Sequence, residues 1–443
     1  MYRIGNQRIA APILAFVSLV VLASFLGCGP YRPDVQGPFN VYLTLPDDTS
    51  HGMVVNYHTL PPAANSEVRY DTVSRAGTAD TYSSHTEGTP QAFTYVPDGR
   101  LVHCVRLQAL APATTYYFVV GDAKSGYSKE YKFRTLPEHS EGLTFVNGGD
   151  MGTSDAAKTL LKLAAAREPW FAIVGGDLSY ASRAPSGAKE WDHWFRNWSE
   201  CMVTPQGYSI PIVTTVGNHE LKDQPASPAF DDRSPFYWRF FGHQGEHPYF
   251  SRKIGDAAFV FLDSGNLVPH EGAQTEWLAA ELAKYKDAPV KFAVYHQPLY
   301  PSYRDFEGDS AAVGRKLWEP LFDQYRVAAA FEHHDHTFKR SKRIKNNEVN
   351  PEGTLYLGDG CFGQKPRKVD GKPRWYLEKS SSTAHFWLVN QTKDTLRFQA
   401  INTEGKVFDE CTLPVAPDAP VSNAPAAAAA QPVQQPETAG AAK

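Results

Sequence analysis

The sequence predicts two domains, an all-β sandwich followed by an α/β domain built on parallel strands. Residues 38–137 alternate short apolar segments with polar turns, which is typical of a β-sandwich. From Leu143 onward, strand-length apolar segments alternate with amphipathic segments of helical length, which is the pattern of βαβ units. A chain of 443 residues has room for two or three such domains.

Composition places the chain among ordinary globular proteins, with 42% hydrophobic and 21% charged residues. The formal net charge is -4 and the sequence pI is about 6.4. Because no strong basic field is present, we do not expect nucleic acid as a partner.

The first 28 residues predict export. Arg3 and Arg8 precede an apolar run over residues 9–26, and Gly27 and Cys28 follow it. The run resembles a bacterial lipoprotein signal, which would place the protein in the periplasm or on the cell surface, tethered by lipid at Cys28. Phe25 and Leu26 depart from that signal, and the alternative is an uncleaved membrane anchor. Residues 29–37 are then a linker, and the Ala- and Pro-rich residues 414–443 are predicted to be disordered.

Four further cysteines leave two possibilities open. Cys104, Cys201, Cys361 and Cys411 contain no Cys-x-x-Cys pair, so a zinc ribbon is not indicated. In an oxidising compartment they could form disulfides of unknown connectivity, or they could remain buried thiols.

In residues 38–137 no catalytic constellation stands out, and we interpret this domain as structural. The segment 107–117 resembles the late-strand signature of fibronectin type III domains.

The second domain is expected over residues 141–413. Ser154 is the predicted N-cap of a helix whose apolar stripe comprises Ala157, Leu160, Leu161, Ala164 and Ala165. Further helices are expected around the aromatic residues of segment 191–198 and over residues 274–285 and 310–325. The predicted strands are residues 143–146, 170–174, 210–216, 258–262, 290–295, 327–331, 354–357, 386–390 and 395–400.

Metal-type side chains follow five of these strands. They are Asp150, Asp177 with Tyr180, Asn218 with His219, His296, and His334 with His336. Each alone is as well explained by a turn or a surface loop. Together they predict one cleft, because parallel strands present their carboxyl ends at the same edge of one sheet.

The order of these motifs resembles the metallophosphoesterase superfamily and, within it, the purple acid phosphatases, which often carry an N-terminal fibronectin-like domain. The matching segments are Gly149-Asp150-Met151-Gly152, Gly176-Asp177-Leu178-Ser179-Tyr180, Gly217-Asn218-His219-Glu220, Ala293-Val294-Tyr295-His296 and His333-His334-Asp335-His336. The resemblance implies an α/β/β/α sandwich for the second domain and metal-dependent hydrolysis of phosphate monoesters. A phosphodiesterase, or a surface binding protein without turnover, is the alternative.

The resemblance also implies roles for individual residues. Asp150, Tyr180 and His336 would hold Fe(III), and Asn218, His296 and His334 would hold a divalent ion of zinc, manganese or iron. Asp177 would bridge the two ions. Hard anionic oxygens suit the trivalent ion, and neutral ligands suit the divalent one. Since His334 and His336 are two residues apart, extended backbone would point both to one side and Asp335 to the other.

His219 is the residue that the resemblance assigns to catalysis rather than to metal. It would stabilise the transferring phosphoryl group or protonate the leaving oxygen, and Glu220 would orient a neighbour. His333 departs from the family pattern because it replaces a glycine, and residues 297–304 lack the histidine pair of plant members. Substrate contacts in that stretch therefore do not transfer.

Overall fold

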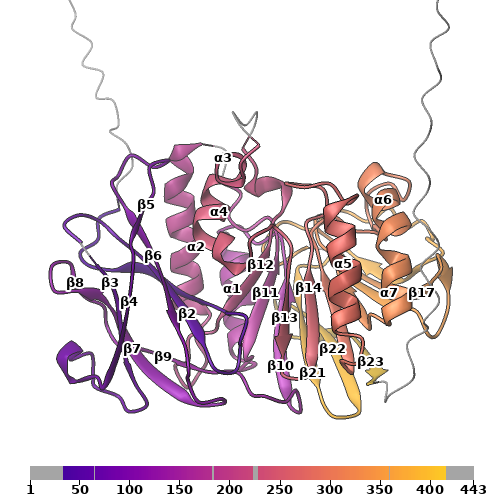
Figure 1. Cartoon of the computed structure of the whole chain (residues 1–443). Helices are drawn as coiled ribbons and strands as arrows, with labels where there is room; N and C mark the ends of the chain where they lie inside the picture. The colour runs from indigo at the N-terminus through magenta and orange to yellow at the C-terminus, as the bar shows by residue number, and fades with distance from the viewer. Residues whose placement is uncertain (1–32, 64, 182–183, 223–227, 359, 416–443) are drawn as a thin grey trace, which may run out of the picture.

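The computed structural model describes residues 33–415, apart from residues 64, 182–183, 223–227 and 359 (Figure 1). The predicted export signal with Cys28 and all but two residues of the predicted tail lie outside the described residues. Within the described part, no helix combines the length and apolar character needed to cross a bilayer.

The N-terminal domain is a sandwich of two antiparallel layers, as predicted. One layer has the order β1-β2-β6-β5, and the other has the order β4-β3-β7-β8 with β9 also paired to β7. The strands are β1 (Phe39–Thr44), β2 (Met53–Thr59), β3 (Ser66–Asp71), β4 (Ser84–Gly88), β5 (Gln91–Ala92), β6 (Leu101–Leu107), β7 (Thr115–Asp122), β8 (Gly126–Tyr127) and β9 (Tyr131–Arg134).

The second domain is the α/β/β/α sandwich that the resemblance implied. Its first sheet has the order β23-β22-β21-β10-β11-β12, and its second has β13-β14-β15-β16-β19-β17-β18, with β20 paired to β17. The first sheet comprises β10 (Leu143–Gly148), β11 (Phe171–Gly175), β12 (Ile212–Thr215), β21 (His385–Gln391), β22 (Thr395–Asn402) and β23 (Val407–Pro414). The second comprises β13 (Phe250–Ile254), β14 (Ala257–Phe261), β15 (Val290–Val294), β16 (Ala329–Phe331), β17 (Phe338–Lys345), β18 (Glu348–Val349), β19 (Thr354–Gly358) and β20 (Leu377–Ser381).

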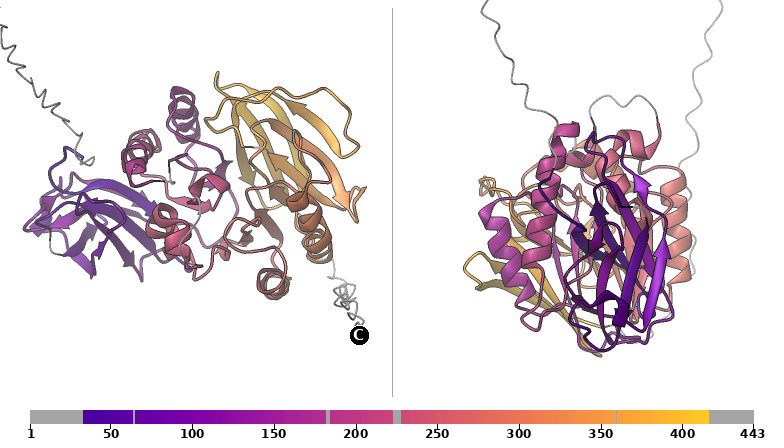
Figure 2. Two further views of the ribbon diagram at one scale, coloured as in Figure 1. Left: turned by 90° about the horizontal axis from the view of Figure 1, so that it is seen from above. Right: turned by 90° about the vertical axis from the view of Figure 1, so that its left-hand side faces the viewer.

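Helices cover the outer faces of the two sheets, and the N-terminal domain sits at one end of the second domain (Figures 1 and 2). Helices α1 and α2 pack on the first sheet, while α5 and α7 pack on the second. The helices are α1 (Asp155–Ala165), α2 (Ala188–Cys201), α3 (Phe230–Arg233), α4 (Pro235–Phe241), α5 (Ala273–Lys284), α6 (Asp309–Leu317) and α7 (Glu319–Tyr325).

Two helices illustrate where local sequence signals succeed and fail. In α1 the Ser154 side chain caps the helix by accepting from the Ala157 N–H, and the five predicted stripe residues are the buried ones. The single helix predicted over residues 310–325 is wrong, because α6 ends at Leu317 and α7 begins at Glu319. Pro320 lies in the first turn of α7, where its missing N–H costs least, so it favours a new start over a continuous helix.

The two domains are joined by more than a linker. Strand β1 pairs in parallel with β12 at Thr44 and Ile212, so one layer of the N-terminal sandwich continues the first sheet of the second domain. The completely buried guanidinium of Arg100 lies 2.6 Å from Asp98 and 2.9 Å from Asp192 of α2. A charge buried in this way is stable only when it is paired, so the contact fixes the N-terminal domain onto α2.

Aromatic side chains fill the space between the two sheets of the second domain. Phe145 of β10 stacks on Phe171 of β11 at 5.1 Å between ring centroids and meets Phe259 and Phe292 of the second sheet edge-on at 5.4 and 5.5 Å. Each such pair contributes about 0.5–1.5 kcal/mol beyond burial of area. This packing holds the sheets face to face and brings the carboxyl ends of their parallel strands together.

Candidate metal centre

The site lies where loops from both sheets meet, which corrects the expectation of one sheet edge. Asp150, Asp177 and Asn218 follow β10, β11 and β12 of the first sheet, while His296 and His334 follow β15 and β16 of the second. The prediction of one sheet failed because the order of the strands along the sequence does not reveal which strands belong to the same sheet.

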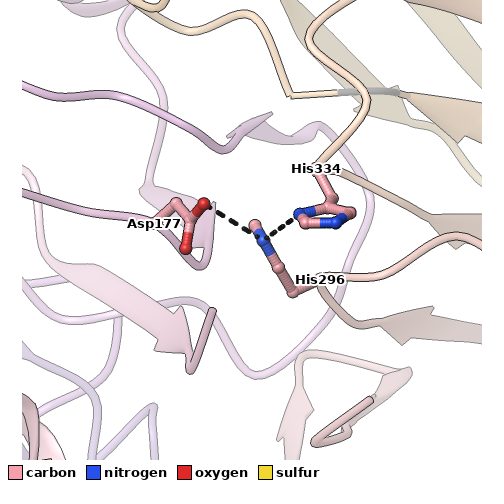
Figure 3. Close-up of side chains that lie close together, drawn as sticks. All are labelled: Asp177, His296 and His334. Atoms are coloured by element: carbon pink, nitrogen blue, oxygen red, sulfur yellow. Dashed lines mark hydrogen bonds and ion pairs between the residues drawn. The ribbon is translucent and has the colours of Figure 1, made fainter. Parts of the chain in front are cut away.

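One cluster of ligand-type atoms surrounds the His296 ring (Figure 3). Its Nε2 lies 3.3 Å from Asp177 Oδ2, 3.2 Å from Asn218 Oδ1 and 3.1 Å from His334 Nδ1. His296 and Asp177 are buried. Atoms that can bind a metal ion, from three side chains that follow strands of both sheets, therefore lie within hydrogen-bonding distance of His296 Nε2.

The tautomer of His296 makes this cluster electron-rich. Its Nδ1 lies 2.9 Å from the Gly175 carbonyl oxygen, which can only accept, so Nδ1 carries the proton and Nε2 presents a lone pair in the neutral ring. Asp177 Oδ2 is buried and accepts no well-formed hydrogen bond within the described residues. Such converging lone pairs are stable when a cation lies among them.

The pKa values of this cluster point to the same need for positive charge. Burial alone would lower the pKa of His296, but the carboxylates of Asp177 and Asp150 outweigh it and raise the pKa to about 10, so a proton on Nε2 supplies the positive charge when no metal ion binds there. Burial and the neighbouring charges of His296 and Arg304 lower the pKa of His334 to about 2. His334 is therefore a neutral ring, the form that binds metal.

A second cluster joins Asp150, Tyr180 and His336. Asp150 Oδ1 lies 2.8 Å from His336 Nε2 and 3.0 Å from the Tyr180 hydroxyl, which is itself 3.0 Å from His336 Nε2. Burial, followed by the negative charge of Asp150, raises the pKa of Tyr180 far above its ordinary value. The phenolate form of Tyr180 thus requires a compensating cation at this cluster.

Five of the seven predicted ligands have left-handed backbone: Asp150, Asp177, Tyr180, His334 and His336, with φ between 52° and 75°. This conformation strains a bulky residue such as tyrosine, and it persists only where the surroundings enforce it. Its concentration on the residues of the two clusters indicates a functional site.

The two clusters fit a pair of metal ions. Two groups of carboxylate and imidazole atoms lie mutually within 4.8 Å, namely Asp177 with His296 and His334, and Asp150 with Asp177 and His336. Ligands about 2.0–2.1 Å from an octahedral ion at right angles lie about 2.9 Å apart, close to the separations in both clusters. Asp177 belongs to both groups, as a bridging carboxylate must.

His219 lies beside the clusters with its ring facing the site. Its backbone N–H donates to Asp177 Oδ1 at 2.7 Å, and its ring Nε2 lies 4.0 Å from Asp177 Oδ2. The ring packs against Tyr180 with centroids 4.4 Å apart, and 36% of the side chain is exposed. A substrate entering the site can therefore reach this imidazole.

Glu220 has a larger role than the sequence suggested. It is completely buried, and its carboxylate accepts the backbone N–H groups of Asp177, Leu178 and Gly217 at 2.7, 2.7 and 2.8 Å. It thereby ties the loop of Asp177 to the loop of Asn218 and His219. Burial and the charge of Asp177 raise its pKa to about 8. The Glu of the Gly-Asn-His-Glu segment was the available signal, but its partners are backbone groups that no sequence pattern reveals.

His333 fills space rather than joining the clusters. Its ring is buried, donates from Nδ1 to the Tyr295 carbonyl at 2.9 Å, and packs where side chains on Gly149 and Gly175 would collide with it. Burial lowers its pKa to about 3, so the ring stays neutral. The histidine at position 333, where the family pattern has a glycine, therefore fits because Gly149 and Gly175 leave space for its ring.

Asp335 points away from the clusters, but the extended-backbone reason given for this is wrong. His334 and His336 are left-handed, so residues 334–336 form a tight loop and not a strand. The Asp335 carboxylate instead accepts the N–H groups of Ser302 and Tyr303, both at 2.8 Å. The four cysteines form no disulfide with one another within the described residues.

Comparison with known proteins agrees with this architecture. The calcineurin-like phosphoesterase family matches residues 105–338, and the purple acid phosphatase N-terminal domain matches residues 38–135. A purple acid phosphatase of Glycine max is 27% identical over 81% of this chain and 81% of its own length. Purple acid phosphatase 1 of Ipomoea batatas is 29% identical over 81% of this chain and 79% of its own.

Other relatives are matched over less of their length. Purple acid phosphatase 23 of Arabidopsis thaliana is 29% identical over 59% of this chain and 62% of its own length. Purple acid phosphatase 15 of the same plant is 26% identical over 72% of this chain and 63% of its own length. Among solved structures, a purple acid phosphatase from yellow lupin, Lupinus luteus, superposes with a TM-score of 0.72 at 19% identity, covering 85% of this chain and 74% of the lupin chain. That likeness concerns the fold. From its family match and its two-domain fold, the chain belongs to the calcineurin-like phosphoesterase family, as a purple acid phosphatase-like member with a fibronectin-like N-terminal domain.

Proposed function

We propose that this protein hydrolyses phosphate monoesters at a binuclear metal centre. The observation that carries the proposal is the convergence of seven ligand-type side chains, five of them on left-handed backbone, with lone pairs facing one another in a buried site. The relatives named above are phosphatases, and the proposal extends that activity to this chain.

The donor chemistry supports an unequal pair of ions. Asp150, Tyr180 and His336 would hold Fe(III), for which carboxylate and phenolate oxygens are suited. Asn218, His296 and His334 would hold zinc, manganese or Fe(II), and Asp177 would serve both ions. When bound, such a pair activates water for attack and neutralises the charge of the phosphoryl oxygens.

The protein's own residues supply positioning and proton transfer. Glu220 binds the backbone N–H groups of Asp177 and Gly217, so the Asp177 carboxylate, which both clusters share, is held in a fixed position. His219 is half-exposed beside Asp177 and Tyr180, where its imidazole can donate a proton to the leaving oxygen. The buried Asp177 carboxylate accepts the backbone N–H of His219, and this hydrogen bond fixes the backbone from which the His219 imidazole would reach the substrate.

The experiment is turnover of 4-nitrophenyl phosphate and bis(4-nitrophenyl) phosphate by one purified sample, with and without chelation. We expect hydrolysis of the monoester at more than about tenfold higher kcat/KM than the diester, lost on chelation and restored by metal. Preference for the diester would make the protein a phosphodiesterase. Tight metal binding without turnover of either ester would make it a binding protein.

We also propose that the protein is exported and tethered to a membrane through Cys28, on the strength of the N-terminal sequence alone. Cell fractionation tests this proposal. Wild-type protein is expected in the membrane fraction with a lipid on Cys28, and Cys28→Ser should abolish the lipid. A membrane-bound Cys28→Ser protein with an unchanged N-terminus would support the uncleaved anchor instead.

A further inference from the structure

We propose that Arg304 and Arg367 form an anion-binding subsite beside the candidate metal centre and select phosphate monoesters whose leaving group carries a second negative charge. The proposal rests on the proposed function and names the substrate class. Neither residue belongs to the motifs that identified the site, and both come from segments far apart in sequence.

Arg367 lies on the outer side of the loop that carries His334 and His336. Its backbone N–H donates to the His336 carbonyl at 2.8 Å, and its Nη1 lies 3.5 Å from the His334 carbonyl. Its guanidinium sits over the ring of the exposed Tyr303, 5.3 Å from the centroid. The positive charge of Arg367 therefore lies next to the loop of residues 334–336, here called the ligand loop, and outside the two clusters.

Arg304 lies on a loop that is fixed from both sides. The Asp335 carboxylate accepts the N–H groups of Ser302 and Tyr303, while Arg374 donates to the carbonyls of Pro301 and Arg304 at 2.9 and 2.7 Å. A loop whose donors and acceptors are both engaged presents its side chains from a preorganised backbone. That rigidity lowers the entropy cost of binding a ligand there.

The charge of Arg304 is only partly compensated. Its Nη1 lies 3.5 Å from Asp335 Oδ1, longer than a charge-assisted hydrogen bond, and 37% of its side chain is exposed. Asp335 also accepts backbone N–H groups, so its negative charge is shared among several donors. The guanidinium keeps donors available for a ligand.

The surrounding segment is basic although the whole chain is not. Residues 364–374 contain five cationic side chains, Lys365, Arg367, Lys368, Lys372 and Arg374, and one acidic side chain, Asp370, whereas the chain has a formal net charge of -4. The segment runs along the site, because the Gln364 N–H donates to the Asp150 carbonyl at 3.1 Å. Together with Arg304, this segment therefore places a field of positive charge beside the ligand loop of residues 334–336. Such a field raises the local concentration of anions.

The position of the Arg304 and Arg367 guanidiniums determines which part of a bound substrate they would contact. Arg367 contacts the His334 carbonyl and Arg304 contacts the Asp335 carboxylate, so both charges lie in a layer beside the rings of the two clusters and not among them. A carboxylate or second phosphate on the leaving group would reach this layer, and the fork of an arginine binds either group with two parallel hydrogen bonds.

The test compares 3-phosphoglycerate with glycerol 3-phosphate, which differ by a carboxylate in place of a hydroxymethyl group. We expect the wild-type protein to favour 3-phosphoglycerate by about tenfold in kcat/KM, mainly through KM, the size of one hydrogen bond to a charged group. In R304Q/R367Q the ratio should fall to about one, with intermediate ratios in each single variant. Lys372→Gln, which removes a charge from the same basic segment, is the matched control and should keep the wild-type ratio.

A wild-type ratio near one, or an unchanged ratio in R304Q/R367Q that retains metal and its wild-type unfolding midpoint, would overturn the subsite. Failure of the proposed function is a different result, namely no turnover of either ester by metal-loaded protein. Calorimetric titration of both esters then decides the subsite alone. Tighter binding of 3-phosphoglycerate that R304Q/R367Q abolishes supports it, and equal binding contradicts it.

Discussion

His103 in the N-terminal domain and His296 in the second domain are both completely buried, yet their surroundings are opposite. His103 lies between the hydroxyls of Thr59 and Ser66, each 2.7 Å from one ring nitrogen, and stacks on Tyr57 at 4.2 Å. Hydroxyls can donate or accept, so both ring nitrogens are satisfied without an ion.

His296 has no such freedom in its partners. Its Nε2 faces a carboxylate, an amide oxygen and another imidazole, and the backbone of the neighbouring site residues is strained. The two environments move the pKa in opposite directions, to about 4 for His103 through burial and to about 10 for His296. A buried histidine with hydroxyl partners is structural, whereas one among acceptors requires a cation.

The largest expected effect comes from changing the residue shared by both clusters. Asp177→Asn should lose both metal ions and lower kcat by at least about 10⁴-fold, because the two-metal clamp disappears with them. Elemental analysis and 4-nitrophenyl phosphate turnover measure the two effects. Full occupancy by two ions in this variant would contradict the bridge.

His219→Ala should keep the metal and still lose about 10²–10⁴-fold in kcat, since a proton donor is removed while the ligands stay. The measurement is kcat beside metal content on the same sample. If metal is lost in proportion to activity, His219 is a ligand and not a proton donor.

Glu220→Gln should lower kcat by about 10–100-fold, the usual cost of losing a group that orients ligands. An amide has one acceptor oxygen where the carboxylate has two, so the three N–H groups of residues 177, 178 and 217 cannot all be satisfied. Glu141→Gln, at an exposed position, is the control. Equal kinetics in the two variants would show that the tie between loops is dispensable.

Tyr180→Phe should bleach a visible absorption band while changing turnover by less than about tenfold, because the iron keeps three protein ligands and the divalent ion keeps all four. The band arises from a phenolate on Fe(III). Spectra of the wild-type and variant proteins test this directly. Oxidised, iron-containing wild-type protein without a visible band would remove Tyr180 from the ligand set.

His103 should affect stability alone. Its folded pKa of about 4 lies below the ordinary 6.5, so the unfolded chain binds the proton first as pH falls. The stabilisation is therefore complete above 6.5 and is lost toward pH 4, with about 2 kcal/mol lost between pH 7 and pH 5. Urea unfolding at the two values measures it, and His103→Gln should show a correspondingly smaller change. The same loss in His103→Gln and in wild type would contradict this, and exposed His139→Gln is the control.

Local signals in the sequence predicted much of this molecule. Residues after strand ends gave the candidate ligands, and Ser154 with its apolar stripe gave helix α1. Six longer strands were missed, because their polar and apolar residues do not alternate clearly, namely β3, β4, β13, β17, β20 and β23, as were the two-residue strands β5, β8 and β18. The division into two sheets and the contacts of Glu220, Asp335 and Arg304 depend on tertiary packing. Those contacts join segments that no periodicity relates.

Metal content of the purified wild-type chain, measured by elemental analysis beside its phosphatase activity, tests the central claim most directly. The convergent lone pairs around His296 and Asp150 predict two ions per chain, one of them iron, and activity that rises and falls with their occupancy. A folded protein that hydrolyses phosphate monoesters with one ion or none would contradict it.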